Sequence, residues 1–351
     1  MSELGAIQLG QRLTSLLNFG RRQTTYKLAT LLALIDVCTE SLPDDSDDTL
    51  EVSIIDLADR VIEYYWQQVE PYTIHGVLLQ GRTSSSDIPN RIRTFKEVQA
   101  LTGTKTLSAP TKKSADYEKL RRKVAHTLAK MPLRYLQTSE WHSGPRDDFL
   151  FDSSWLVKKD ATLEELDKHN WSIVLNSSVA WNLAAIAPLI RPVIELQWLQ
   201  DINDFNQVTL EKEDLAGFMF GSTRTSLVKL GPSLTDSQSG KCFYCSGKLS
   251  KTDLEIDHVI PFSRIPLNGL SNLVAADRKC NNDKRATLPI WGHVDRALSR
   301  DIEVLQEIEA SQNWPILLTR TKDSALGVYK LLPQKTQLWV SLKTYDYSQV
   351  C

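Results

Sequence analysis

Side chains that bind metal ions or transfer protons are concentrated in one short part of the chain, between residues 242 and 285. They are Cys242, Cys245, Asp257, His258, Asn272, Asp277, Cys280, Asn281 and Lys284. Carboxylate and amide oxygens are hard ligands that suit Mg²⁺ or Mn²⁺, whereas thiolates suit Zn²⁺. An imidazole, whose ordinary pKa is about 6.5, can accept a proton from water near neutral pH. The set therefore predicts metal binding combined with acid–base chemistry.

Four short motifs in this segment resemble those of the HNH endonucleases. In chain order they are "CFYC", "DHVIP", "NLV" and "CNNDK". The resemblance implies a ββα-metal fold, in which two strands and a helix surround one divalent cation, and it implies hydrolysis of phosphodiester bonds. It covers about an eighth of the chain. For residues 1–225 the motifs indicate no family.

The resemblance also implies roles for individual residues. Phosphodiester cleavage needs an activated water, stabilisation of the added negative charge and help for the leaving oxygen. By resemblance, His258 activates the water and Asn272 holds the loop that orients His258. Asp257 and Asn281 hold Mg²⁺ or Mn²⁺ against the phosphate. Lys284, one turn into the predicted helix, contacts the phosphate.

The clustered cysteines indicate a second, structural metal site. Cys242 and Cys245 have the spacing of half a zinc site, and in a chain without an export signal such clustering favours metal over disulfides. Members of the family often complete the site with a second Cys-x2-Cys pair, but here Asp277 stands in place of its first cysteine, before Cys280. We predict Zn²⁺ bound by the three thiolates, with the contribution of Asp277 left open.

Charge is distributed unevenly along a chain whose net charge is only −2. Residues 81–136 contain thirteen Lys and Arg against four Asp and Glu. Within this segment, Arg121, Arg122 and Lys123 lie on a predicted helix and are candidates for phosphate contact. A solvated helix face explains the same pattern equally well. Arg285, next to Lys284, is a further candidate for contact with nucleic acid.

Hydrophobic periodicity predicts an α+β protein, mainly helical in its N-terminal region, with a C-terminal ββα-metal domain. Helices are expected over residues 8–40, and a further helix is expected to begin after a cap at Ser53. A buried helical segment is expected over residues 172–205, with breaks near Pro188 and Pro192. Short strands are expected at 147–159, 315–320, 327–332 and 337–343. Four regions are predicted. They are a helical, winged-helix-like recognition or sensing region at 1–136, a mixed region at 137–225, the HNH domain at 226–295, and a helix with a small sheet at 296–351.

The N-terminal residues lack the pattern of a signal peptide, and the most apolar segment, 179–190, is too short to span a bilayer. We therefore expect a cytoplasmic protein that is not bound to a membrane. The predicted function is metal-dependent cleavage of DNA, with RNA not excluded, in a restriction, phage-defence or mobile-element system. Cutting both strands with one such site per chain favours a homodimer. The alternative is a catalytically inactive zinc-ribbon protein that binds nucleic acid or regulates.

Overall fold

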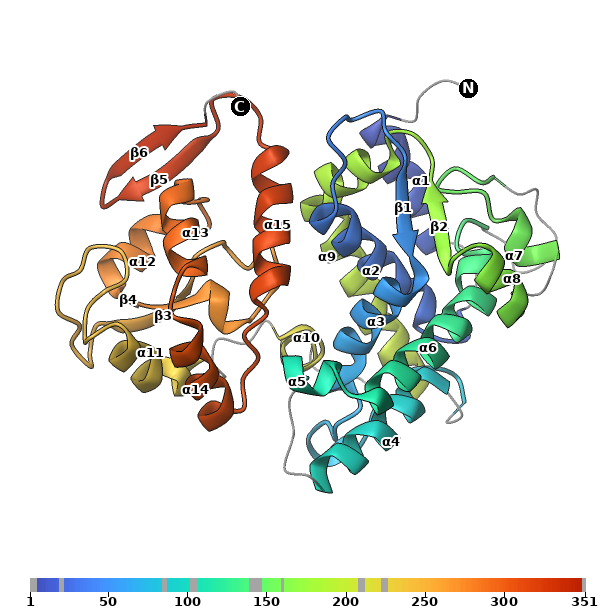
Figure 1. The fold of residues 1–351 in the computed structure, drawn as a ribbon, viewed down its shortest axis with the longest axis horizontal. Helices are drawn as coiled ribbons and strands as arrows, with labels where there is room; N and C mark the ends of the chain where they lie inside the picture. The colour runs from blue at the N-terminus through green and yellow to red at the C-terminus, as the bar shows by residue number, and fades with distance from the viewer. Residues whose placement is uncertain are drawn as a thin grey trace. The chain divides into compact units, whose positions relative to one another are not determined.

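The structure is a computed structural model that describes residues 5–18, 22–83, 87–101, 107–138, 147–158, 161–207, 212–221 and 227–348. The fold is α+β, with long helices in the N-terminal region and short strands toward the C-terminus (Figure 1). Two compact units are distinguished. The first comprises residues 1–105 and 112–220, and the second comprises 106–111 and 221–351. Regions 1–136 and 137–225, predicted as separate, thus fold largely as one unit.

The first unit is built from helices around a buried central helix, α2. The helices are α1 (Ala6–Asn18), α2 (Tyr26–Glu40), α3 (Ile54–Gln68), α4 (Asp87–Leu101), α6 (Ala115–Lys130), α7 (Ser154–Lys158), α8 (Leu163–Lys168), α9 (Val179–Asn206) and α10 (Lys212–Phe220). Most of the short helix α5 (Ala109–Lys112) belongs to the second unit. Strands β1 (Leu50–Ser53) and β2 (Ser172–Leu175) pair antiparallel. Ser53 caps α3 as predicted, since its hydroxyl accepts from the backbone N–H of Asp56 at 3.3 Å.

The longest helix, α9, packs against α1 and α2 and differs from its prediction. It runs unbroken through Pro188 and Pro192. Both prolines lie on the exposed side of the helix, where water can satisfy the carbonyl groups that each proline leaves without a donor. At 28 residues, α9 is long and apolar enough to cross a membrane by length and composition, and a third of its most apolar window is buried.

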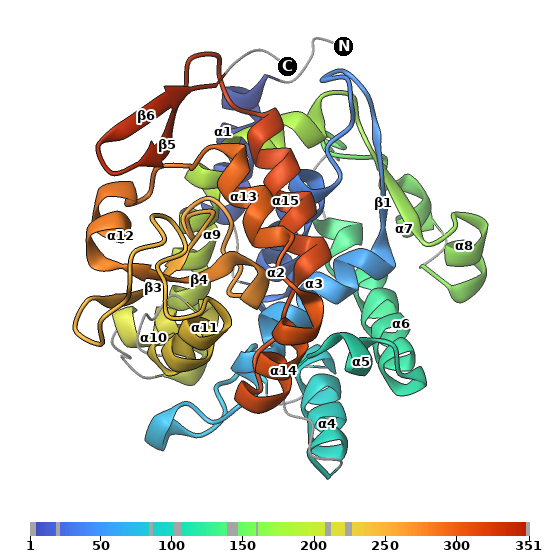
Figure 2. The same ribbon diagram turned by 60° about the vertical axis from the view of Figure 1, so that its left-hand side comes forward.

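The second unit contains the predicted ββα element and the helices that surround it. Its elements are α11 (Gly231–Ser237), β3 (Leu254–His258), β4 (Leu273–Asp277), α12 (Arg278–Lys284), α13 (Trp291–Leu298), α14 (Ile302–Gln312), α15 (Leu318–Lys330), β5 (Gln337–Ser341) and β6 (Thr344–Tyr347). Strands β3 and β4 pair antiparallel, and α12 contacts both (Figures 1 and 2). The unit therefore has the ββα order that the motifs predicted.

Three strand predictions were wrong. Residues 318–320 and 327–330 of the two later segments belong to the helix α15. In the segment predicted at 147–159, Ser154–Lys158 forms α7 and Phe151 makes a single bridge to Leu175, while residue 159 lies outside the described residues. Short apolar runs do not distinguish a strand from a buried helix, and packing decided these cases. The segment 337–343 does form a strand, β5.

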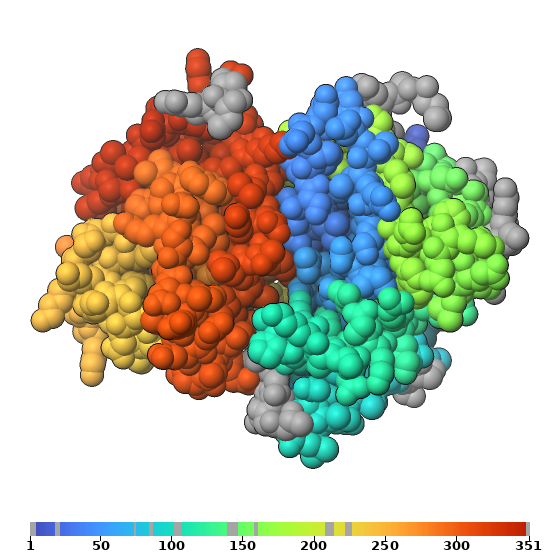
Figure 3. All heavy atoms as spheres, viewed as in Figure 1, coloured from blue at the N-terminus to red at the C-terminus, as the bar shows by residue number. Residues whose placement is uncertain are grey.

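The C-terminal elements complete the core of the second unit. Trp339 of β5 is fully buried beside Tyr244 and donates from its indole N–H to Asp283 of α12 at 2.8 Å. In the space-filling view, orange and red atoms of the C-terminal elements cover much of the visible face of this unit (Figure 3). Residues beyond the motif segment are therefore structural partners of the ββα element.

A buried charged cluster in the first unit generates a stability prediction. Arg191 of α9 pairs with Asp36 of α2, and its guanidinium also donates to the hydroxyl of Tyr64. Burial, and secondarily the charge of Asp36, outweighs the effect of Arg191 and raises the pKa of Glu195 to about 6. The folded state therefore binds a proton that the unfolded chain has already released.

Because the pKa is raised in the folded state, stability should fall as pH rises from about 4.5 to about 6. We expect Glu195→Gln to stabilise the protein above pH 6, by up to about 2 kcal/mol, and to have little effect below pH 4.5. Urea unfolding of parent and variant at pH 4.5 and 7.5 measures this. An equal effect of the substitution at both pH values would contradict the assigned titration.

Candidate active site and metal centre

The ββα element places Asp257 and Lys284 in direct contact. Alternation along β3 directs Asp257 to the same side as Glu255, and this side faces α12. The ammonium of Lys284 lies 2.9 Å from Oδ2 of Asp257 and donates to the backbone carbonyl of His258 at 2.8 Å. Tyr244 donates its hydroxyl to the same Oδ2 at 2.6 Å. Burial, and secondarily the negative charge of Asp257, raises the pKa of Tyr244 well above its ordinary value, so the phenol remains a donor.

This contact corrects the predicted role of Lys284. Its side chain is fully buried, with 0% exposure, so the ammonium is not placed to contact a phosphate. Lys284 instead joins the end of α12 to the end of β3. Lysine is rarely buried unless it is paired, which is why the sequence indicated an exposed role.

Asn281 is held by a neighbour that the motifs did not indicate. Its amide Nδ2 donates to Oε2 of Glu255 at 2.6 Å, and Arg278 holds the other carboxylate oxygen at 3.2 Å. A carboxylate only accepts hydrogen bonds, so the NH₂ group of Asn281 must face Glu255. Its Oδ1 atom is thereby directed away from Glu255, in an orientation suited to a ligand atom.

His258 ends β3, opposite Leu273 of β4. Its Nε2 atom lies 2.7 Å from Oδ1 of Asn268, and its ring packs at 5.3 Å against that of Phe262. Asn268 belongs to the loop between the two strands. This residue, like Glu255, is a partner that the motifs did not indicate.

Asn272 fixes the turn that follows His258. It is buried, its Oδ1 accepts from the backbone N–H of Ile260 at 2.9 Å, and its Nδ2 donates to the carbonyl of Ile260 at 3.0 Å. The backbone N–H of Val259 also donates to the carbonyl of Asn272 at 2.8 Å. The side chain thus bridges loop backbone next to His258, in a geometry that suits the predicted orienting role.

The cysteine motifs converge on one point. The ligand atoms of Cys242, Cys245, Asp277 and Cys280 all lie within 4.8 Å of one another. Sulfur atoms around a tetrahedral zinc ion are about 3.8 Å apart for Zn–S bonds of about 2.3 Å, so the four groups fit around a single ion. The backbone N–H groups of Gly247 and Asp277 point at the sulfurs of Cys245 and Cys242, and such donors stabilise thiolates.

Asp277 has two functions at this centre. Its Oδ1 accepts from the backbone N–H of Cys280 at 2.9 Å and caps α12, while its Oδ2 lies 3.0 Å from the sulfur of Cys245. Burial acts to raise the pKa of Asp277, but hydrogen bonds from Cys245 and the Cys280 backbone outweigh it and hold the pKa below its ordinary value. The carboxylate is therefore ionised and available as the fourth ligand.

A bound metal ion would stabilise the deprotonated form of the buried cysteines. Burial raises the pKa of Cys242 to about 11 and also raises that of Cys280, so both are neutral at pH 7 unless a cation replaces their protons. Metal binding would convert them to thiolates. The donor set is that of a structural site, with three thiolates and one carboxylate.

The hard-oxygen groups form a different kind of site. Among the described residues, Asp257 and His258 belong to no group of three or more Asp, Glu, His and Cys side chains close enough to share an ion. An ion at Asp257 would therefore need the amide oxygen of Asn281 and oxygens from water or phosphate. Mg²⁺ and Mn²⁺ accept such mixed oxygen ligands. Tyr244 and Lys284 both contact Oδ2 of the Asp257 carboxylate, which leaves Oδ1 as the atom to ligate.

The predicted basic surface of the first unit is largely neutralised. Arg121 lies 3.0 Å from Asp59 of α3 and 2.9 Å from Glu118, and Arg122 pairs with Glu118 at 3.0 Å. Lys123 is exposed. Asp59 lies outside residues 81–136, so the count of charges in that segment did not include it. The predicted phosphate contact of Arg121 is not supported. Arg285, at the end of α12, is exposed and keeps its predicted role as a proposal.

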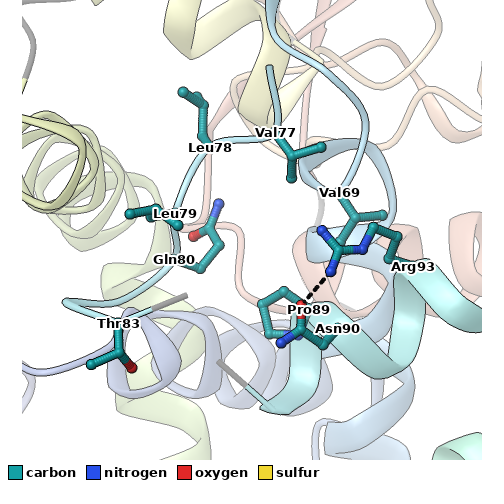
Figure 4. Close-up of a pocket in the computed structure, with 9 residues that line it drawn as sticks. All are labelled: Val69, Val77, Leu78, Leu79, Gln80, Thr83, Pro89, Asn90 and Arg93. Atoms are coloured by element: carbon teal, nitrogen blue, oxygen red, sulfur yellow. Dashed lines mark hydrogen bonds between the residues drawn. The ribbon is translucent and has the colours of Figure 1, made fainter. Parts of the chain in front are cut away.

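A small cavity of about 120 Å³ lies in the first unit (Figure 4). Its walls include Val69, Val77 and Pro89, with Arg93 at one side donating to Asn90 at 2.8 Å. It has room for a few water molecules and contains no carboxylate, histidine or cysteine. The cavity therefore has none of the groups of the candidate active site.

Two family models match the chain. Residues 5–219 match the family described as a domain of unknown function (DUF8808), which covers more than half of the chain. The chain belongs to the DUF8808 family. Residues 242–290 match the model described as HNH endonuclease, so the resemblance inferred from the motifs is confirmed for this segment. Searches of curated proteins and of solved structures found no significant match.

These matches place the candidate chemistry outside the DUF8808 region. The ββα element and the cysteine cluster both lie in the HNH segment. The HNH match indicates a nuclease domain, for which the substrate class is nucleic acid, and the four-residue cluster has its ligand atoms close enough together to hold one metal ion. The motifs did not indicate Glu255. Its spacing could have done so, because a residue two positions before Asp257 lies on the same side of β3.

The burial of Lys284 predicts a large effect on stability. We expect Lys284→Met to lower the free energy of unfolding by about 3–5 kcal/mol, because it leaves the carboxylate of Asp257 buried without its cation. Lys279→Met is a matched control on the exposed side of α12 and should change stability by less than about 0.5 kcal/mol. Chemical denaturation measures both. A stable Lys284→Met protein with weakened DNA binding would restore the phosphate-contact role.

The cysteine cluster predicts coupled loss of metal and stability. We expect Cys242→Ser to release bound zinc, measured by elemental analysis, and to lower the Tm of the second unit by roughly 5–10 °C, because structural metal contributes to folding. Cys38→Ser, in α2 of the first unit, should retain the metal. Asp277→Cys should bind zinc more tightly than the parent, and Asp277→Ala less tightly. Parent protein purified without metal, and unable to take up zinc, would refute the site.

Proposed function

We propose that this protein is a metal-dependent endonuclease that hydrolyses phosphodiester bonds in DNA. The observation that carries the proposal is the placement of His258, Asp257 and Asn281 on one ββα element within the segment that matches the HNH endonucleases. The chemistry of these side chains is that of proton acceptance and hard-cation binding. Each is held by neighbouring side chains or backbone, as expected of groups that must be pre-positioned.

In the proposed reaction, His258 takes a proton from a water molecule. The water oxygen forms a bond to phosphorus, and the bond between phosphorus and the leaving sugar oxygen breaks. The leaving oxygen gains a proton from solvent, and His258 later returns its proton to solvent. One phosphodiester and one water thus give an alcohol and a phosphate monoester.

Asp257 and Asn281 would hold Mg²⁺ or Mn²⁺ through their Oδ1 atoms. When bound, such an ion supplies charge stabilisation to the phosphate. Lys284 and Tyr244 both contact Oδ2 of Asp257, so only Oδ1 of this carboxylate would face the ion. Asn272 would keep the turn after His258 in place, and Arg285 would contact the phosphate chain.

The cysteine cluster would bind Zn²⁺ as a structural ion. It joins the 242–247 turn to the junction of β4 and α12, and so would fix the start of the helix that carries Asn281. The thiol ligands need a reducing compartment, which is why a cytoplasmic location is part of the proposal. We further propose a role in restriction or defence, in which the DUF8808 unit selects or senses the target.

The proposal is tested with supercoiled plasmid and the full chain in Mg²⁺, Mn²⁺ or EDTA. We expect nicked or linear product with either ion and none with EDTA. His258→Ala should reduce cleavage by about 10²-fold or more while retaining DNA binding. His75→Ala, an exposed histidine of the first unit, should cut like the parent.

A parent protein that binds DNA but cuts neither DNA nor RNA with any of these ions would favour the alternative function, a zinc-containing binding or regulatory protein. Cleavage of RNA alone would move the substrate class to RNA. His258→Ala cutting as fast as the parent would show that another group activates the water.

A further inference from the structure

The side chain of Asn268 is held at both of its ends. Its Oδ1 faces Nε2 of His258 at 2.7 Å, and its Nδ2 donates to the backbone carbonyl of Gly221 at 2.9 Å. A carbonyl oxygen only accepts hydrogen bonds, so the contact with Gly221 determines which end of the amide faces His258. The oxygen faces the imidazole.

Gly221 is required for this arrangement. Its φ of +68° lies in the left-handed region, and a Cβ atom at this position would lie 2.8 Å from Nδ2 of Asn268. Any other residue type would thus meet both backbone strain and a clash with the amide. Residue 221 therefore lies where a side chain would disturb the contact that anchors Asn268.

The backbone of the same loop is fixed from the C-terminal side. The indole N–H of Trp314 donates to the carbonyl of Asn268 at 2.5 Å, and the N–H of Leu270 donates to the carbonyl of Pro315 at 2.9 Å. Gly269 lies so close to this segment that a Cβ would be 2.5 Å from the carbonyl oxygen of Ile316. The loop therefore has little freedom to move Asn268 away from His258.

We propose that Asn268 is a positioning residue that fixes the tautomer of His258, with the proton on Nε2 and the lone pair on Nδ1. The amide oxygen of Asn268 offers only an acceptor to Nε2, so the neutral ring must donate from that atom. The role of His258 as the base rests on the proposed function, but the tautomer does not.

The direct test is the tautomer of His258 in the full chain, measured by two-bond ¹⁵N–¹H correlation spectra of histidine-labelled protein, with His258→Ala assigning the signal. We expect the Nε2–H form in the parent at a pH where the ring is neutral. Asn268→Ala should give a mixture of tautomers, whereas Asn282→Ala, an exposed amide of α12, should leave the signal unchanged. An Nδ1–H ring in the parent would overturn the proposal.

The second readout is the rate of plasmid cleavage. Asn268→Ala should lower the rate by about 10²-fold. Asn268→Asp keeps an acceptor for Nε2–H, so it should keep the Nε2–H tautomer and recover much of the rate that Asn268→Ala loses. A purely structural role would lower the rate of both variants equally, and would overturn the proposal. Circular dichroism checks that the variants fold.

The two proposals fail in distinguishable ways. If the parent shows the Nε2–H form but cuts no nucleic acid, the positioning role of Asn268 stands and the nuclease function falls. If the parent cuts and the Asn268 variants retain both its rate and its tautomer, the nuclease function stands and the positioning role falls.

Discussion

The ion pair between Lys284 and Asp257 is the contact on which the candidate site depends. A fully buried ammonium needs a compensating charge, and Asp257 supplies it while the carbonyl of His258 takes a second hydrogen bond. Helix α12 is thereby fixed against the end of β3, and Asn281, one turn earlier on α12, is brought beside Glu255. Lys284 was expected to contact a phosphate. It is instead buried, and its ammonium stabilises the scaffold of the site by pairing with Asp257.

Further contacts fix the start of α12 and the loop that contains Asn268. Asp277 caps α12 and shares the cysteine cluster, so a metal ion there would fix the start of the same helix whose end Lys284 holds. Trp339 reaches Asp283 from β5, and Trp314 reaches the Asn268 loop. Both tryptophans lie beyond the matched segment 242–290. The HNH element of this protein is therefore completed by its own C-terminal helices and hairpin.

The motifs predicted the local geometry of the HNH segment because metal ligands and cap residues act through short spacings. The convergence of Cys242, Cys245 and Cys280, and the ββα order, follow from such local patterns. The burial of Lys284, the pairing of Arg121 with Asp59 and the strand predictions that became α15 depend on residues distant in the sequence. Local charge and short apolar runs contain no information about those partners. The roles of Glu255 and Asn268 were missed for the same reason.

The central claim is that Asp257 and Asn281 hold one divalent ion beside His258. Paramagnetic broadening by Mn²⁺ in zinc-loaded, ¹⁵N-labelled full-length protein tests it most directly. We predict that low Mn²⁺ concentrations broaden the side-chain amide signal of Asn281 and the backbone signals of Asp257 and His258. Persistence of the Asn281 and Asp257 signals at saturating Mn²⁺ would contradict the claim.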